Sequence, residues 1–390
     1  MAPQTGAAGP SLNKLIDKLA AFEPTNLPVI SLYLNAQSNE HGKTDFDRFL
    51  RKEFSERAKT WAAHTPERES FDRDAERIQQ YLEGVSPSAN GVAVFACAGA
   101  DDFFEAAQLD APIESHRLYI YNQPHLYPLA RVAEQYRRYA ALVCDTNRAR
   151  IFVFGQGATV ASDEIENVKV NRTKVGGWSQ MRFQRHADNY HMQHAKEIVE
   201  TLDQLVEKEG VEAVILAGDE VIIPVLRAQL PKRLEDKVID VLSLDIRAPE
   251  KEVYEASLEA MRAYDAQTDA EKVERLINEY RGGGLAVVGA TDTLNALSMG
   301  QVDELFLTAT MREIKGERED VEILSDNEVV EPELAASDPA AVANIEPDSV
   351  IVADELVTRA QQTSAGITFI EDPGLLAEFG GVGATLRYRI

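Results

Sequence analysis

The segment formed by residues 167–196 is rich in basic side chains, the type that can bind phosphate. It contains six lysines and arginines against a single acid, Asp188, whereas the whole chain of 390 residues has a net charge of −25. Arginine forms paired hydrogen bonds with phosphate, and the Gly176-Gly177 pair permits a close backbone approach. Acid elsewhere opposes phosphate binding at long range, so any nucleic-acid contact must be local. From charge alone a solvated surface loop is the simpler interpretation, and contact with a sugar–phosphate backbone is the alternative. The basic residues are Lys169, Arg172, Lys174, Arg182, Arg185 and Lys196.

Three of the seven histidines lie in the same segment. His191 and His194 are three positions apart with His186 upstream, a spacing that could hold zinc. Apart from Asp188, no fourth ligand is obvious, so we expect no metal and a helix face turned toward solvent or RNA. The chain lacks the P-loop, nucleophile-elbow and HExxH motifs, and we expect no cofactor. Cys144 stands in an apolar run and is expected to be a core residue.

The elements that must position this segment form an α/β unit. Residues 140–145 and 150–154 predict two strands joined by a tight Thr-Asn turn. Residues 187–208 predict a helix whose apolar face includes Ile198 and Leu202. Strands predicted at 213–216 and 238–244 follow, and this alternation favours a mostly parallel sheet covered by helices. The basic segment would then lie at the start of the helix.

Two further α/β units flank the central one. Residues 1–136 predict strands at 29–34, 91–97 and 117–121 and helices at 46–63 and 71–82. A long helix at 251–280 leads to a third unit, with a helix at 292–299 and strands at 285–290, 304–308, 367–370 and 385–390. Residues 379–383 predict a glycine-rich turn. Residues 312–349 are acidic and weakly periodic, and we interpret them as a partly mobile insertion.

Composition indicates the cellular compartment in which the protein is expected. The sequence has only two cysteines, no window of about 18 uninterrupted apolar residues, and no basic stretch followed by an apolar one near its start. These features predict a reduced, cytoplasmic protein without a membrane partner.

Segments spread along the chain resemble the archaeal and eukaryotic class-1 peptide release factors and their Pelota relatives. Gly176-Gly177-Trp178-Ser179-Gln180-Met181-Arg182-Phe183 is similar to the family's Gly-Gly-Gln-Ser-x-x-Arg-Phe loop, and residues 214–218 to its strand ending in Leu-Ala-Gly. Residues 291–300, TDTLNALSMG, resemble its Asp-Thr-Leu-x-Ala-Leu-x-x-Gly segment. The ending FGGVGATLRYR at 379–389 is similar to its Phe-Gly-Gly-Ile-Gly-x-x-Leu-Arg-Tyr-Arg. The resemblance covers nearly the whole chain and is weaker over the first unit.

This resemblance implies a three-domain α/β architecture of mixed sheets with flanking helices, in a bacterial branch of the family. The domains would be an N-terminal α/β domain at 1–136, a central domain at 137–275, and an L7Ae-like C-terminal domain at 276–390 that carries the insertion 312–349. The implied partners are the ribosome, through rRNA and peptidyl-tRNA, and a translational GTPase bound by the C-terminal domain, with no DNA.

The sequence departs from the family at two sites. The family's glutamine directly follows Gly-Gly, but here that position is Trp178 and Gln180 comes two residues later, a Gly-x-x-Gln spacing that resembles the quality-control peptidyl-tRNA hydrolases. The family's stop-codon readers, an Asn-Ile-Lys-Ser loop and a Tyr-x-Cys segment, are missing, because residues 55–60 read SERAKT and residues 119–122 read YIYN. We therefore expect no stop-codon decoding.

Two functions stay open. The first is a rescue hydrolase in which Gln180 orients the attacking water while Gly176 and Gly177 permit the loop conformation. The second is a non-enzymatic hibernation factor of the Balon type, which occupies the A site and the peptidyl-transferase centre, with Trp178 stacked on RNA bases. In both, Trp178 and His186 join the six basic residues in contacting RNA. A diverged function on the same scaffold, such as nuclease action on tRNA, is a third alternative.

Overall fold

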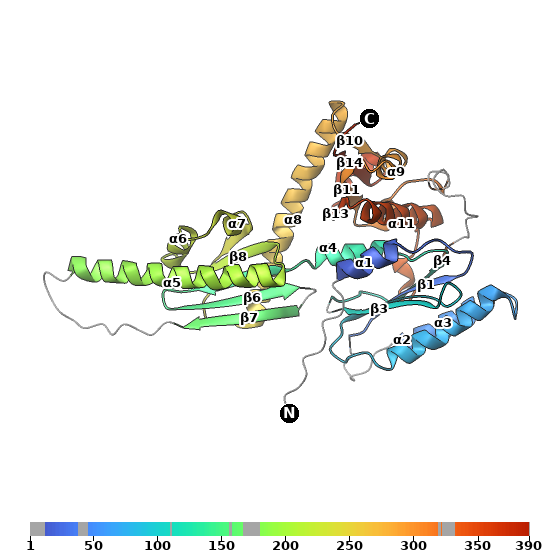
Figure 1. The fold of residues 1–390 in the computed structure, drawn as a ribbon, viewed down its shortest axis with the longest axis horizontal. Coiled ribbons are helices and arrows are strands. Elements are labelled where there is room, and N and C mark those ends of the chain that lie inside the picture. Colours follow the sequence, from blue (N-terminus) through green and yellow to red (C-terminus); the bar gives the residue numbers. More distant parts are fainter. Residues whose placement is uncertain are drawn as a thin grey trace. The chain divides into compact units, whose positions relative to one another are not determined.

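The computed structural model describes residues 12–37, 46–109, 111–155, 158–166, 180–318, 321 and 332–389 (Figure 1). The chain divides into two compact units. One combines Met1–Gln135 with Asp269–Ile390, and the other is Tyr136–Thr268. The fold is of mixed α/β type, with three sheets among the described residues: two in the first unit and one in the second.

The first sheet of the two-segment unit has the strand order β12-β4-β1-β2-β3 and is antiparallel throughout. Leu32 and Val94 point to one face, where they pack with α2 and α3, while Tyr33 and Phe95 point to the other. This alternation is the period-2 pattern of strands covered on both faces. The bounds are α1 (Leu12–Ala20), β1 (Val29–Asn35), α2 (Phe46–Arg57), α3 (Pro66–Leu82), β2 (Gly91–Cys97), β3 (Phe103–Leu109), β4 (Arg117–Tyr121) and α4 (Tyr127–Gln135).

The second sheet of this unit has the order β10-β14-β11-β13, with β11 and β13 parallel. Leu305 and Leu307 face α9 and α11, and Phe306 faces the buried Val273 and Leu276 of α8. The bounds are α8 (Glu250–Arg281), β10 (Ala286–Val288), α9 (Ala290–Ser298), β11 (Val302–Thr308), β12 (Glu333–Ala336), α11 (Pro347–Gln362), β13 (Gly366–Ile370) and β14 (Val382–Leu386), with short 3₁₀ turns at Met311–Glu313, Pro339–Ala341, Pro373–Leu375 and Ala377–Phe379.

The structure differs from the sequence expectations for the C-terminal region in two places. The weakly periodic segment 312–349, for which no element was predicted, contains β12, which pairs with β4 and buries Ala335 to 9% exposure. Ala and Glu are poor strand formers, so only the partner strand makes this segment a strand. The last strand begins at Val382 rather than at 385, because the turn is complete at Gly380 and Gly381, whose φ angles are +66° and +77°.

The central sheet lies in the unit 136–268 and has the order β7-β6-β5-β8-β9. Strands β5, β8 and β9 are parallel, while β5, β6 and β7 form an antiparallel meander, so the sheet is mixed. Leu142 faces α5 and α6, and Val143 faces α8 on the other side. The bounds are β5 (Tyr139–Cys144), β6 (Arg148–Gly155), β7 (Ala158–Glu166), α5 (Gln180–Glu209), β8 (Ala213–Gly218), α6 (Ile222–Arg227), α7 (Lys232–Glu235) and β9 (Val238–Leu242).

Within the described ranges, every helix is too short or too polar to cross a membrane. The two cysteines are buried in different sheets and form no disulfide with one another.

Candidate functional site in the central unit

The basic segment follows the end of β7 at Glu166 in the sequence, and its second part, from Gln180 to Lys196, belongs to α5. Six of the predicted site residues lie outside the described residues: Lys169, Arg172, Lys174, Gly176, Gly177 and Trp178. Four more, Gln180, Arg182, Arg185 and His186, belong to the first turns of α5, and only their place on the helix is described. Lys196 is exposed on the same helix. The structure thus places Gln180 at the first residue of a 30-residue helix.

The second half of α5 fixes this helix on the sheet. Ala195, Ile198 and Leu202 are fully buried, and they recur at the helical spacing of three and four residues. They pack with β5, β6 and α6 in one apolar cluster. The helix is therefore anchored well downstream of Gln180, by residues whose pattern the sequence displays.

His194 is part of this anchor, which overturns the expectation that both histidines of α5 would face solvent or RNA. Only 1% of His194 is exposed, whereas His191 is half-buried. Burial lowers the pKa of His194, and hydrogen bonding to the backbone of Arg148 and Asp145 acts in the opposite direction. His194 therefore ties α5 to the β5–β6 turn, in a buried position that disfavours its charged form. The prediction was wrong because helical periodicity does not show which polar side chain will be buried against the sheet.

The β5–β6 turn is built by Asp145. Its Oδ1 accepts the backbone N–H groups of Asn147 at 2.6 Å and Arg148 at 2.7 Å. The predicted hairpin is confirmed, with Cys144 paired to Ala149. Sequence reasoning did not single out Asp145, although an Asp followed by Thr-Asn is a common turn signal.

The ends of the parallel strands β5 and β8 hold no reactive group that the structure activates. Burial raises the pKa of the Cys144 thiol to about 12, and the nearby Asp219 adds to this shift. Gly218 has a φ of +154°, and a Cβ atom there would lie 2.1 Å from the Cys144 carbonyl oxygen. Asp219 Oδ1 accepts the backbone N–H groups of Val221 and Ile222 and so holds the turn that leads into α6. The prediction that Cys144 is a core residue is confirmed.

Among the residues with described side chains, no three His, Cys, Asp or Glu side chains are grouped so as to hold a metal ion. This finding covers neither the 167–179 segment nor the side chains at the start of α5.

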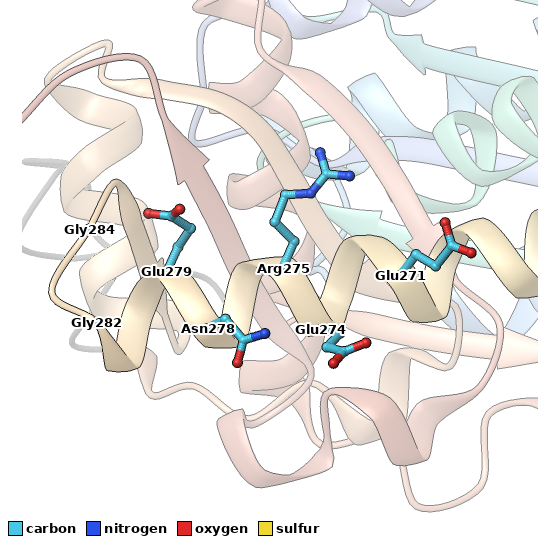
Figure 2. A pocket seen from close by; sticks show the side chains of 7 residues that line it. All are labelled: Glu271, Glu274, Arg275, Asn278, Glu279, Gly282 and Gly284. Atoms are coloured by element: carbon cyan, nitrogen blue, oxygen red, sulfur yellow. The ribbon is translucent and has the colours of Figure 1, made fainter.

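An acidic groove lies outside the central unit, along the last turns of α8. It has a volume of about 530 Å³ and is lined by Glu271, Glu274, Arg275, Asn278, Glu279, Gly282 and Gly284. Figure 2 shows Glu279 extending toward Gly284, with Arg275 on the same side of the helix. Three carboxylates against one guanidinium oppose a phosphate ligand here. This groove gives no alternative to the central unit as the place of an RNA contact.

Two protein-family models match successive parts of the chain. Residues 124–262 match the model for "Bacterial archaeo-eukaryotic release factor family 10", and residues 266–390 match the model for "eRF1 domain 3". The first match covers the central sheet with α5, and the second covers the sheet β10-β14-β11-β13. The chain is thus similar to the archaeo-eukaryotic release factors over its central and C-terminal regions, and the family matched by the central region is a bacterial one.

Curated relatives of this release-factor-like protein extend over most of its length. It is 24% identical to peptide chain release factor subunit 1 of Pyrococcus abyssi, over 97% of this chain and 98% of that protein. Identity to the corresponding protein of Methanobrevibacter smithii is 24%, over 72% of each chain. An uncharacterized protein of Mycobacterium tuberculosis is 25% identical, over 85% of this chain and 88% of that protein.

Two solved structures also align with the release-factor-like chain. A model of ribosome-bound archaeal Pelota and ABCE1 has a TM-score of 0.43 and 14% identity, over 97% of this chain and 94% of that one. The archaeal termination factor aRF1 has a TM-score of 0.27 and 18% identity, over 97% of each chain.

Proposed function

We propose that the protein binds the ribosomal A site and promotes hydrolysis of the ester that joins a stalled peptide to tRNA, as a ribosome-rescue factor. One observation carries this proposal: the Gly-Gly-x-x-Gln segment ends at Gln180, the first residue of a long helix. This helix is anchored on the central sheet, which lies within the region that matches the bacterial release-factor family model. The anchor, from His194 to Val206, lies at the other end of that helix. A rigid helix behind a glycine-rich loop suits a loop that must reach into a narrow RNA-lined site.

The chemistry asks little of the protein. A peptidyl-tRNA ester is intrinsically labile, so holding one water in line with the carbonyl carbon supplies much of the rate. A glutamine amide can orient that water without acting as a strong base. Gln180 is the proposed positioning group, and Gly176 and Gly177 permit the backbone conformation. The basic residues from Lys169 to Lys196 would bind rRNA and tRNA phosphates, together with His186.

The proposed factor acts without reading a stop codon. The N-terminal domain has SERAKT at 55–60 in place of an Asn-Ile-Lys-Ser loop. Arg57 in this segment is engaged within the fold, where its Nη1 lies 3.0 Å from Glu333 and its Nη2 donates to the Leu334 carbonyl oxygen. A side chain held in this way supports a structural role for this stretch.

The C-terminal domain is proposed to bind a translational GTPase. Its match to the third domain of the release factors supports this assignment, and the acidic groove along the last turns of α8, where this domain begins, favours a protein surface over bare phosphate. With these roles the protein would act on translating or idle ribosomes in the cytoplasm. The proposed domains are residues 1–136, 137–275 and 276–390.

Trp178 favours a second candidate function. It occupies the position of the family's glutamine, and an indole stacked on a base contributes roughly 1–3 kcal/mol to RNA binding. A hibernation factor that plugs the A site of idle ribosomes would use this stacking and would need no hydrolysis.

Peptide release separates the two functions. Rescue hydrolysis predicts that Gln180→Ala slows release of labelled peptide from stalled ribosomal complexes by about 10²-fold, the scale expected when a positioning group is removed. Ribosome binding should hardly change, and Gln184→Ala, one turn further along α5, is the matched control. If the wild-type protein binds ribosomes but releases no peptide above the buffer rate, the hydrolase proposal is wrong and the plug stands.

A further inference from the structure

The first turn of α4 is held by a carboxylate from a distant part of the chain. Asp354 of α11 is 1% exposed, and its Oδ1 accepts the backbone N–H groups of Leu126 at 2.9 Å and Tyr127 at 3.0 Å. Its Oδ2 is hydrogen-bonded to Nδ1 of the buried His125. Asp354 therefore does for α4 what an N-cap residue does, with a negative charge at the positive end of the helix.

Tyr127 adds a second attachment in the same turn. Its hydroxyl donates to the Thr308 carbonyl oxygen of β11 at 2.5 Å, and its ring meets the Phe369 ring of β13 edge-on, with 5.2 Å between centroids. One turn further along α4, Arg131 lies 3.2 Å from Glu371. Every partner in these contacts comes from the C-terminal domain.

The chain enters the central unit after α4 and leaves it through α8. Both helices pack against the C-terminal domain. The central unit starts at Tyr136, directly after α4 ends at Gln135. The return connection is α8, which crosses from the central unit into the other at Thr268–Asp269. Beyond that point Val273 and Leu276 of α8 are 1% and 0% exposed against the sheet that contains β11 and β13.

We propose that Asp354 and Tyr127 form a latch that roots the first connection of the central unit in the C-terminal domain. With the latch closed, α4 is a rigid tether from its first turn. With the latch open, its first turn is released and the tether lengthens by the part of the helix that frays. The C-terminal domain thereby limits the range of orientations open to the central unit, which carries the Gln180 segment. Asp354 and Tyr127 are positioning residues and touch no substrate.

The test measures the width of a distance distribution in the full-length protein. Nitroxide labels are introduced at two exposed helix positions, by Gln204→Cys in α5 and Asn295→Cys in α9, and pulsed electron resonance records the distances between them. The native Cys97 and Cys144 are buried and should not react. Hydrogen exchange at the Leu126 and Tyr127 amides reports independently whether the latch is open.

Asp354→Ala should speed exchange at those two amides by more than about tenfold and broaden the distribution about twofold. Asp354→Asn should partly restore both, because its amide oxygen can still accept a backbone N–H. Ser349→Ala is the matched control: it removes another buried hydrogen bond of α11, from Ser349 Oγ to the Ile314 carbonyl oxygen, without touching α4. It should leave the width unchanged.

Two results would overturn the proposal. In the first, Asp354→Ala opens the latch by exchange while the width stays at the wild-type value. In the second, exchange at Leu126 and Tyr127 does not change. If Asp354→Ala fails to fold, Tyr127→Phe carries the same test, because it removes one hydroxyl and keeps the ring contact with Phe369.

Discussion

Individual residues set the chemistry of this protein more by where they are buried than by their type. His194 and Cys144 are reactive residue types, yet burial lowers the pKa of the first and raises that of the second. Asp74 of α3 shows the same effect in a carboxyl group. It is fully buried and accepts the backbone N–H of Ala98 at 2.7 Å, and burial raises its pKa to about 6.

Asp74 should make the first domain less stable as the pH rises. Its pKa in the unfolded chain is near the ordinary value of about 3.9, so the folded protein binds the proton more tightly. The stabilisation is fully present below pH ~4 and is lost as the pH rises through about 6, a loss of roughly 2–3 kcal/mol. Asp74→Asn should flatten this dependence in denaturant unfolding between pH 4 and 7. Asp72→Asn, an exposed neighbour on α3, should keep it, and equal slopes in wild type and Asp74→Asn would contradict the assignment.

At the scale of elements, the sequence predicts what local pattern controls and misses what distant pairing controls. Strands Gly91–Cys97 and Arg117–Tyr121 are confirmed at both ends, because their apolar runs are bounded by turn residues. The second half of α5 follows from the stripe that includes Ile198 and Leu202. Strand β12 could not be predicted, because ELAA is a strand only against β4. The cap of α4 by Asp354 could not be predicted either, since Asp354 lies 228 residues along the chain from Leu126.

The pairing of β12 with β4 gives a test by proline substitution. The Ser337 N–H donates to the His116 carbonyl oxygen, so strand alternation points the Ala335 N–H toward β4 and the Ala336 N–H away from it. Ala335→Pro should speed hydrogen exchange at the Leu118 and Ile120 amides by about tenfold or more, whereas Ala336→Pro should change it little. Equal exchange in the two variants would mean that β12 does not protect β4.

At the scale of the whole molecule, the distribution of charge along the chain and the order of its motifs support the proposed function. The chain carries a net charge of −25, whereas residues 167–196 hold six of its 40 lysines and arginines against a single acid. The resemblance to the release factors could be predicted from spaced motifs, and two of them contain glycines whose backbone conformation the structure explains: Gly218, with a φ of +154°, and Gly380 and Gly381 of the ending. The geometry of the 167–179 segment could not be predicted, because neither hydrophobic period nor a turn signal fixes the path of these residues. The proposed function therefore depends on whether this segment contacts ribosomal RNA.

Ribosome binding as a function of salt tests that claim most directly. Wild-type protein should co-sediment with ribosomes, and the logarithm of its affinity should fall linearly with the logarithm of salt concentration. Replacing Arg172, Lys174, Arg182 and Arg185 together by Ala should weaken binding and reduce that slope by about one unit for each phosphate that is no longer neutralised. A matched fourfold variant at Lys14, Arg51, Lys232 and Arg312, outside the segment, should bind like wild type. The proposed function is contradicted if wild type does not bind, or if the segment variant binds as tightly and with the same slope.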